Sequence, residues 1–283
     1  GVMFTHGNLA TSAHTASHYM GWTAADRYLH SFPLFHANGG LLGVGPAIVA
    51  GATIVLAERF SASSFGRSLV EHDATLVPVN STHVKMILRN PPTADDAAHR
   101  VRRMMLGLSL HPDEWLAFED RFNTRLVPTY GLTEALTLVT AGTVTGPRRV
   151  GSAGRVVRGY EVRVVGEDGQ PVDVDSPGEA QVFSHQRHGF AQGYYRDPGR
   201  TAEVFGDRWL KTGDIVRVDA DGYLWFVERQ KDMIKRSGFN VAAAEVERVI
   251  RDVPGVADVV LDHVALHDAI TSPFTLRWLR FAA

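Results

Sequence analysis

Cysteine is absent from the 283 residues of this chain. Its absence excludes disulfide bonds, thiolate metal sites and a cysteine nucleophile. Because disulfides are concentrated in secreted proteins, a chain without cysteine is typical of an intracellular protein. We therefore expect a cytoplasmic location.

An excess of charge of one sign is also missing. The chain has 29 Lys and Arg against 31 Asp and Glu, which gives a formal net charge of −2. The two signs are mixed along the sequence, without the basic stripe that would indicate a nucleic-acid partner. Hydrophobic residues make up 45% of the chain, enough for the core of one large domain or two smaller ones.

Long apolar runs are scarce. Residues 1–9 have neither a basic start nor an apolar run, so no signal peptide is expected. Residues 39–57 carry no charge, and a membrane span needs about 20 such residues. Five glycines and Pro46 interrupt this stretch, and its β-branched residues gather at 53–55. We predict a buried helix followed by a core strand, and no transmembrane segment.

Up to about Leu132, short apolar runs alternate with amphipathic segments. This alternation predicts an α/β fold, with a mostly parallel sheet covered by helices on both faces. Ligand sites in such sheets lie at the carboxyl ends of the strands. The predicted strands are 28–32, 52–56, 75–79, 103–108 and 125–129, and the predicted helices lie near 9–20, 41–50, 63–71, 82–88 and 112–122.

Between residues 150 and 227 the pattern changes. Segments with alternating apolar and polar residues, such as 160–165, are separated by closely spaced turn sequences. This predicts a small antiparallel β-barrel or sandwich. A charged, hinge-like segment at 228–232 follows it.

The last part of the chain predicts a small α+β unit. Asn240 is suited to cap a helix, and a strand is predicted at 256–260. The apolar face of this helix would consist of Val246, Val249, Ile250 and Val253.

Tyr130-Gly131-Leu132-Thr133-Glu134 follows the strand predicted at 125–129. The segment places an aromatic ring, a glycine, a hydroxyl and a carboxylate at one strand end. The ring can stack on a base, the hydroxyl can bond a phosphate oxygen, and the carboxylate suits Mg²⁺, which prefers oxygen ligands. The alternative is a turn followed by a helix start, where Glu134 complements the helix dipole.

Two later segments complete an ordered set of motifs. Residues 209–214 read Trp-Leu-Lys-Thr-Gly-Asp, and residues 228–240 read Glu-Arg-Gln-Lys-Asp-Met-Ile-Lys-Arg-Ser-Gly-Phe-Asn. Taken in order, the three motifs resemble the adenylate-forming superfamily of acyl-CoA synthetases, amino-acid adenylation domains and firefly luciferase. The resemblance extends from Gly1 to about Val260. Residues 1–9, 151–155 and 193–202 support it. Residues 90–100 and 108–110 are most similar to carnitine/betaine-type CoA ligases.

The resemblance implies a nucleotide site. Tyr130 and Gly131 would lie at the adenine, Thr133 would contact the α-phosphate, and Glu134 would hold Mg²⁺. The ribose hydroxyls would be bound by Asp214. The residues implied in binding ATP or AMP are therefore Tyr130, Gly131, Thr133, Asp214 and Arg229.

The same resemblance implies a moving C-terminal domain. Lys231 would be the hinge between two catalytic poses, and Lys235, Ser237 and Gly238 would border the channel for CoA. The segment Pro33-Leu34-Phe35-His36 matches the part that flanks the acyl pocket, so His36 is the candidate for the acyl site.

The implied reaction has two steps. A small carboxylic acid reacts with ATP to give acyl-AMP and pyrophosphate, and CoA then takes the acyl group, so that ATP, Mg²⁺ and CoA are all required. The implied domains are 1–228, the C-terminal part of a large AMP-binding domain, and 229–283, the hinge with a truncated C-terminal domain. Within the first, 1–149 would be α/β and 150–228 barrel-like.

The chain departs from the superfamily in three places. Of a phosphate loop that ends in Pro-Lys-Gly-Val, only Gly1 and Val2 are present. A Gly-Gly-Ala turn against adenine is replaced by Leu106-Gly107-Leu108, which implies a reshaped adenine wall. Residues 261–283 lack the expected catalytic lysine and are atypical, for which a frameshift near Leu261 is one hypothesis. We expect this chain alone to show little or no adenylation.

Other interpretations stay open at this point. An adenylating enzyme that loads a carrier protein, or a non-catalytic nucleotide-binding protein, would carry the same motifs. Arg148 and Arg149 are interpreted as surface charge rather than a phosphate site, and Tyr194 and Tyr195 as packing within the barrel. The sequence predicts neither the particular carboxylic acid nor the oligomeric state.

Overall fold

The computed structural model describes residues 1–230 except 108, 137 and 207. Beyond 230 it describes 233–236, 239–242, 246–247, 249–250, 253, 256–260 and 278–281. Lys231, Ser237 and Gly238, predicted for the hinge and the CoA channel, lie outside the described residues, as does Leu108.

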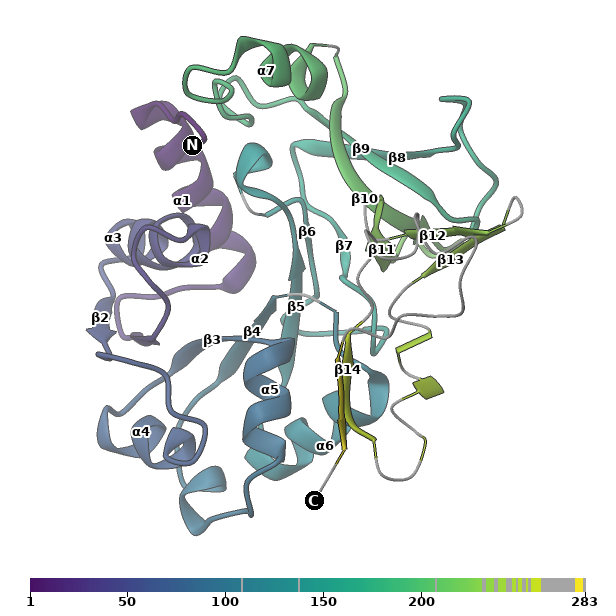
Figure 1. Ribbon diagram of the computed structural model, residues 1–283. Helices are drawn as coiled ribbons and strands as arrows, with labels where there is room; N and C mark the ends of the chain where they lie inside the picture. Colours follow the sequence, from purple (N-terminus) through teal and green to yellow (C-terminus); the bar gives the residue numbers. More distant parts are fainter. Residues whose placement is uncertain are drawn as a thin grey trace.

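A seven-stranded sheet forms the centre of the first half of the chain (Figure 1). Its strand order is β2-β1-β3-β4-β5-β6-β7, and the first five strands in this order run parallel. These strands are β1 (Arg27–His30), β2 (Thr53–Leu56), β3 (Leu76–Asn80), β4 (Arg103–Gly107) and β5 (Leu126–Tyr130). The parallel α/β arrangement predicted from the sequence is confirmed.

Helices cover both faces of this sheet because alternate strand residues point to opposite sides. Tyr28, Leu76 and Met105 share one buried cluster with α1 (His6–Met20) and α3 (Gly45–Ala50). Leu29, Val77 and other strand residues form the second cluster with α4 (Phe65–Glu71), α5 (Ser81–Leu88) and α6 (Pro112–Phe122). Figure 1 shows α1 and α3 apart from α4, α5 and α6.

The predicted segments differ from the structure mainly at their ends. Helix α1 begins at His6, because Thr5 and Asn8 form a capping box that fixes its start. The helix predicted at 41–50 is a π-helical turn, η1 (Gly40–Val44), that continues into α3. The strand predicted at 52–56 is present as β2, but it is an edge strand of the sheet and not the core strand that was predicted.

Across the described residues, the structure contains no helix with the length and apolar character of a membrane span. Two short antiparallel strands that the sequence did not predict, β6 (Thr140–Ala141) and β7 (Arg155–Val156), extend the sheet beyond β5.

A second sheet contains four antiparallel strands in the order β11-β10-β9-β8. They are β8 (Tyr160–Val165), β9 (Gly178–Ser184), β10 (Leu210–Val218) and β11 (Leu224–Arg229), and helix α7 (Pro198–Phe205) lies between β9 and β10 in the chain. Its inner residues, such as Tyr160 and Val216, join the same buried cluster as Tyr130 of β5. The predicted antiparallel character is confirmed, while closure into a barrel stays a prediction.

Two hairpins follow in the chain. Strand β12 (Met233–Arg236) pairs with β13 (Phe239–Ala242), and β14 (Val256–Val260) pairs with β15 (Trp278–Phe281). The predicted strand at 256–260 is confirmed. The predicted helix cap at Asn240 is wrong, because Asn240 lies inside β13 opposite Lys235, where backbone pairing to a neighbouring strand outweighs its capping preference.

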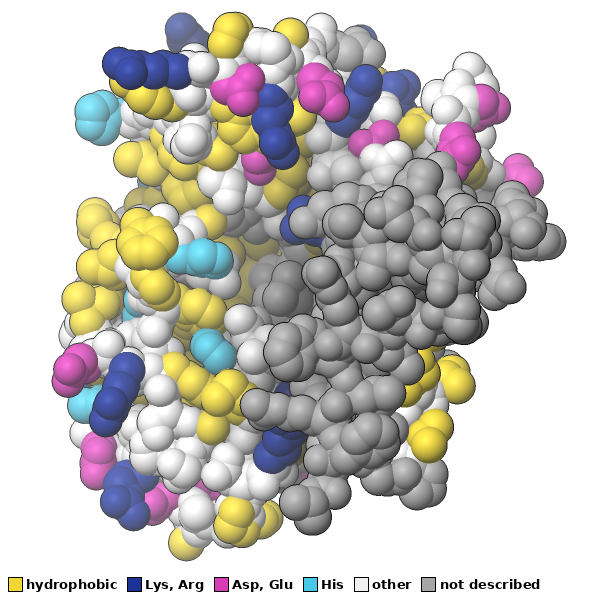
Figure 2. Space-filling view, viewed as in Figure 1, with side chains coloured by type: hydrophobic (Ala, Val, Ile, Leu, Met, Phe, Trp, Pro, Cys, Tyr) yellow, Lys and Arg dark blue, Asp and Glu magenta, His cyan; other side chains and the backbone are white. Residues whose placement is uncertain are grey.

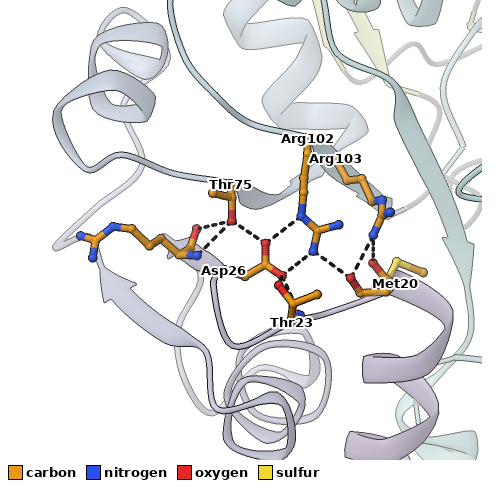
Figure 3. Close-up of polar contacts among 8 residues, drawn as sticks. Met20, Thr23, Asp26, Thr75, Arg102 and Arg103 are labelled. Atoms are coloured by element: carbon orange, nitrogen blue, oxygen red, sulfur yellow. Dashed lines mark hydrogen bonds and ion pairs between the residues drawn. The ribbon is translucent and has the colours of Figure 1, made fainter.

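Asp26 organises the amino ends of the parallel strands (Figure 3). It lies just before β1, is 2% exposed, and accepts hydrogen bonds from Thr75, which precedes β3, and from Arg102, which precedes β4. Thr23 contributes a backbone and a side-chain donor at 2.7 and 3.0 Å. One carboxylate therefore connects the starts of three strands.

Arg102 and Arg103 extend this cluster to the end of α1. Arg102 donates to the carbonyl of Gly21, and Arg103 donates to that of Met20 (Figure 3). Cations at the carboxyl end of a helix satisfy its last carbonyls and favour its dipole. Burial acts to raise the pKa of Asp26, but the hydrogen bonds from Arg102 and the two threonines outweigh it and lower the pKa to about 2.

Replacing Asp26 with Asn should lower the free energy of unfolding by about 3 kcal/mol at pH 7, because a buried ion pair loses its charged acceptor. The folded pKa lies below that of an unfolded Asp, so this stability is present above about pH 4 and is lost as the pH falls toward 2. Urea unfolding of both proteins from pH 7 to pH 3 checks this.

The matched control is Asp221→Asn, which removes an exposed ion pair with Arg149. Its unfolding curve should follow that of the unsubstituted chain. A gap between the D26N and unsubstituted chains that stays constant down to pH 3 would contradict a stabilising role for the Asp26 charge.

Candidate functional site

Tyr130 is the last residue of β5 and lies where the two sheets meet. Its side chain is 8% exposed, and its hydroxyl donates a hydrogen bond of 2.9 Å to Oδ2 of Asp214 in β10. Burial, and then the charge of Asp214, hold the pKa of Tyr130 well above its usual value. The hydroxyl therefore remains a donor at neutral pH.

A bulge in β10 turns Asp214 inward. Gly213 has φ +67, a conformation that favours glycine, and the pairing of β10 with β9 shifts between Lys211 and Ile215. Thr212 holds the bulge: its hydroxyl donates to the carbonyl of Ala180 and accepts from the backbone N–H of Asp214. The Thr-Gly-Asp sequence thus places a 2% exposed carboxylate between the sheets.

Arg229 lies opposite Asp214 in the pairing of β10 with β11. Its Nε is 2.9 Å from Oδ1 of Asp214, and its side chain is 51% exposed. This contact is an ion pair by distance, yet Oδ1 is buried and receives no hydrogen bond from the described residues. Burial raises the pKa of Asp214, although Arg229 and Tyr130 act to lower it. The carboxylate is therefore short of donors.

Glu134 lies in the 3₁₀ turn η3 (Thr133–Ala135) that follows β5. Its carboxylate Oε1 accepts a hydrogen bond of 2.5 Å from the hydroxyl of Tyr194, and its carbonyl accepts one of 2.9 Å from the N–H of Ala191. Leu136, which ends the turn, is buried with φ 59. A bulky residue in the left-handed region costs energy, and such strain is concentrated at functional sites.

Residues 188–191, which contact Glu134 through the N–H of Ala191, are themselves held in place. The hydroxyl of Tyr160 donates to the carbonyls of Gly189 and Ala135, at 2.7 and 3.2 Å. The amide of Asn8 in α1 donates to the carbonyls of His188 and Phe190, at 2.9 and 2.7 Å. The turn that carries Thr133 and Glu134 is thus joined to α1 and to β8.

His36, the candidate for the acyl site, is exposed in the structure. Its Nδ1 accepts the N–H of Asn38 and so caps the short helix α2 (Ala37–Gly39), and its ring stacks on Phe32 at 6.0 Å. In the space-filling view the molecule is hollowed near the centre of this face, and histidine and hydrophobic side chains border the hollow (Figure 2).

A small cavity lies at the carboxyl ends of the parallel strands. Asn38 lines it, whereas His36 does not. The hydroxyl of Tyr28, buried and without a hydrogen-bond partner in the described residues, belongs to its wall. The full lining is Tyr28, Asn38, Leu42, Pro78, Val79, Met105, Gly107 and Thr129. Sequence reasoning missed Tyr28, since a tyrosine within a strand gives no sign that its hydroxyl will be unpaired.

The arginines and tyrosines interpreted as structural divide into two groups. Arg149 is an exposed surface charge paired with Asp221, as predicted. The prediction that Tyr195 packs within the barrel is wrong, because its side chain is exposed. Arg148 is not a surface charge: it forms two contacts with Glu119 of α6, which is largely buried. Tyr194 packs against Phe205, as expected for a packing residue, but its hydroxyl also contacts Glu134.

The structure thus brings together Tyr130, Asp214 and Arg229 in direct contact, and places Glu134 four residues after Tyr130 in the adjoining turn. Gly131 and Thr133 lie between them, partly buried. Lys235 lies in β12, beyond these contacts in the sequence. Within the described part of the chain, no group of three or more His, Asp or Glu side chains is arranged to hold a metal ion.

A family model described as "AMP-binding enzyme" matches residues 1–195. The crotonobetaine/carnitine–CoA ligases of Shigella sonnei (strain Ss046) and Escherichia coli O9:H4 (strain HS) are each 34% identical over 275 residues, covering 95% of this chain and 52% of the relative. The chain therefore spans about half the length of the curated relatives it matches.

Solved structures also share the fold of this chain. The O-succinylbenzoate coenzyme A synthetase of Bacillus subtilis, in complex with ATP and magnesium ion, is 29% identical with a TM-score of 0.77, over 92% of this chain and 53% of that one. ATP-bound MatB from Rhodopseudomonas palustris is 25% identical with a TM-score of 0.81, over 92% and 51%.

Replacing Tyr130 with Phe should lower the free energy of unfolding by about 2 kcal/mol, because the buried carboxylate of Asp214 loses the hydroxyl that donates to it. Urea unfolding at pH 7 measures the change. The control is Tyr195→Phe, which alters an exposed hydroxyl. Equal stability of the Y130F and Y195F proteins would show that the hydrogen bond does not join the sheets.

Proposed function

The chain belongs to the AMP-binding enzyme family, and on this basis we propose that it forms the nucleotide-binding part of an ATP-dependent acyl-CoA ligase. In the first step an oxygen of a small carboxylic acid attacks the α-phosphorus of ATP, the bond to pyrophosphate breaks, and an acyl adenylate forms. In the second, the thiolate of CoA attacks the acyl carbon, and AMP leaves with the electrons of the broken bond. The names of the relatives favour CoA over a carrier protein as the acceptor.

The observation that carries this proposal is the buried Oδ1 of Asp214, which forms an ion pair with the half-exposed Arg229 but receives no hydrogen bond from the described residues. Oδ1 is buried without a hydrogen-bond donor among the described residues, although Oδ2 is satisfied by Tyr130. A buried acceptor without a hydrogen-bond donor costs about 1–3 kcal/mol, and the nearby charge of Arg229 offsets part of this cost. Hydroxyls supplied by a ligand would remove this cost, and the ribose of ATP or AMP has two adjacent ones. Arg229, beside Oδ1, favours the charged form of the carboxylate that accepts them.

Glu134 is suited to a magnesium ion that is held mainly by the phosphates of the bound nucleotide and by water. The described residues offer no cluster of three potential metal ligands, so a protein-only metal cage is not what this region provides. Mg²⁺ commonly binds through one or two carboxylates together with phosphate oxygens and water. Mg²⁺, when bound, would offset the negative charge of the phosphates. Glu134 would supply the carboxylate for it.

The remaining nucleotide contacts follow from the order of residues after β5. Tyr130 would flank the adenine with its ring while its hydroxyl holds Asp214. Gly131 leaves room for the nucleotide beside it, and Thr133 would donate its hydroxyl to the α-phosphate. These groups act by position: they fix the α-phosphorus relative to the incoming carboxylate and provide donors where charge develops.

The other half of the site rests on the family resemblance alone. We assign the hinge to Lys231, the channel for CoA to Lys235, Ser237 and Gly238, and a place beside the acyl group to His36. His36 is exposed and contacts the backbone of Asn38, which lines the cavity, and this supports a role at the entrance rather than inside.

The domain assignment is part of the same proposal. Residues 1–228 would be the C-terminal part of a large AMP-binding domain, whose antiparallel sheet closes into a small barrel. Residues 229–283 would be the hinge and a C-terminal α+β unit. The two hairpins described beyond residue 230 support a separate unit after the hinge.

Replacing Asp214 with Asn should weaken AMP binding about 30-fold, because a charged acceptor for the ribose hydroxyls becomes a neutral amide. The same change should not lower the free energy of unfolding. Burial already disfavours the charged carboxylate, and the Asn oxygen can still accept from Tyr130. Calorimetric titration with AMP, together with urea unfolding, measures both effects.

The matched control is Asp173→Asn, at an exposed position after β8, which should bind AMP like the unsubstituted chain. AMP affinity that is unchanged in the D214N protein would refute the ribose assignment. No AMP binding by the unsubstituted chain would refute the proposed function itself.

A further inference from the structure

The hydroxyl of Tyr194 lies 2.5 Å from Oε1 of Glu134, and the two residues are 60 positions apart in the sequence. Among the described residues, Tyr194 is the side-chain donor to this carboxylate, and it engages one of the two carboxylate oxygens. A hydrogen bond to one oxygen restrains the orientation of a carboxylate and leaves its other oxygen for a further contact.

The backbone of Tyr194 is fixed from two sides. It pairs with Val2 in an antiparallel bridge, and its N–H donates to the hydroxyl of Thr201 at 2.9 Å. Gly193, immediately before it, has φ +114, and a Cβ there would come within 2.4 Å of Thr201. The close approach to α7 therefore requires glycine at 193.

The ring of Tyr194 is fixed as well. Phe205 packs edge-on against it at 5.9 Å between ring centroids, and the guanidinium of Arg200 lies 5.3 Å from the ring centroid. Both residues belong to α7.

We propose that Tyr194 is a positioning residue, which orients the carboxylate of Glu134 so that its free oxygen faces a magnesium–nucleotide complex. The proposal rests on the proposed function, in which Glu134 binds Mg²⁺. Tyr194 acts through Glu134 and does not itself touch the nucleotide. Groups that orient a metal-binding side chain typically change metal affinity by about 10-fold to 100-fold.

A role in packing alone would need the ring and not the hydroxyl. The edge-on ring contact with Phe205 would be the same for phenylalanine. Tyr194→Phe therefore removes the hydrogen bond and retains the packing, which separates the two roles. Tyr195→Phe is the matched control, since the neighbouring hydroxyl belongs to an exposed side chain.

The experiment is a calorimetric titration of the full chain with ATP, in Mg²⁺ and in EDTA, and with AMP in EDTA. The dissociation constant of ATP in EDTA, divided by that in Mg²⁺, is the Mg²⁺ ratio, and it reports how much Mg²⁺ strengthens ATP binding. Y194F should reduce this ratio about 10-fold, while the AMP affinity stays within about twofold of the unsubstituted chain. Y195F should change neither value.

A double-mutant cycle with Glu134→Gln tests whether Tyr194 acts through Glu134. E134Q should itself reduce the Mg²⁺ ratio, and adding Y194F to it should reduce the ratio little further, because the two changes remove one interaction. Full additivity of the two losses would overturn the proposal.

Two further results separate this proposal from the one it rests on. AMP binding with an unchanged Mg²⁺ ratio in Y194F would overturn the role of Tyr194 and leave the nucleotide site intact. Absence of nucleotide binding by the unsubstituted chain, in Mg²⁺ and in EDTA, would overturn both.

Discussion

The hydrogen bond between Tyr130 and Asp214 joins the two sheets of this protein. Tyr130 ends a parallel strand and Asp214 lies in the bulge of an antiparallel one, 84 residues later. Because both side chains are buried, the bond can form only when the sheets are packed together. The other oxygen of Asp214 forms an ion pair with Arg229 but receives no hydrogen bond from the part of the chain that the structure describes, so the packing that completes the fold also prepares a binding group.

Two buried aspartates show how the surroundings assign different tasks to one side chain. Asp26, at the amino ends of the strands, receives donors on both oxygens, and its pKa is lowered despite burial. Asp214, at the opposite ends, has on Oδ1 an ion pair with Arg229 but no hydrogen bond from the described residues, and burial raises its pKa. A satisfied carboxylate stabilises the fold, whereas an unsatisfied one costs stability and suits a ligand.

Much of this arrangement could be predicted from the sequence, because strands and helices leave local patterns. The five parallel strands follow from short apolar runs, and the segment at 130–134 follows from its place after a strand. Contacts between distant residues leave no such pattern. Nothing near Tyr194 indicates that its hydroxyl reaches Glu134, and nothing near Asn240 indicates that it pairs within a hairpin. The edge position of β2 likewise depends on the order of strands, which local hydrophobicity does not encode.

The central claim is that nucleotide binds where β5 and β10 meet, and hydrogen–deuterium exchange with and without AMP tests it directly. Backbone amides at 126–134 and 210–216 should exchange more slowly when AMP is present, with no change at 20–27 and 100–103, around Asp26. Unchanged exchange at 210–216, with AMP bound elsewhere in the chain, would contradict it.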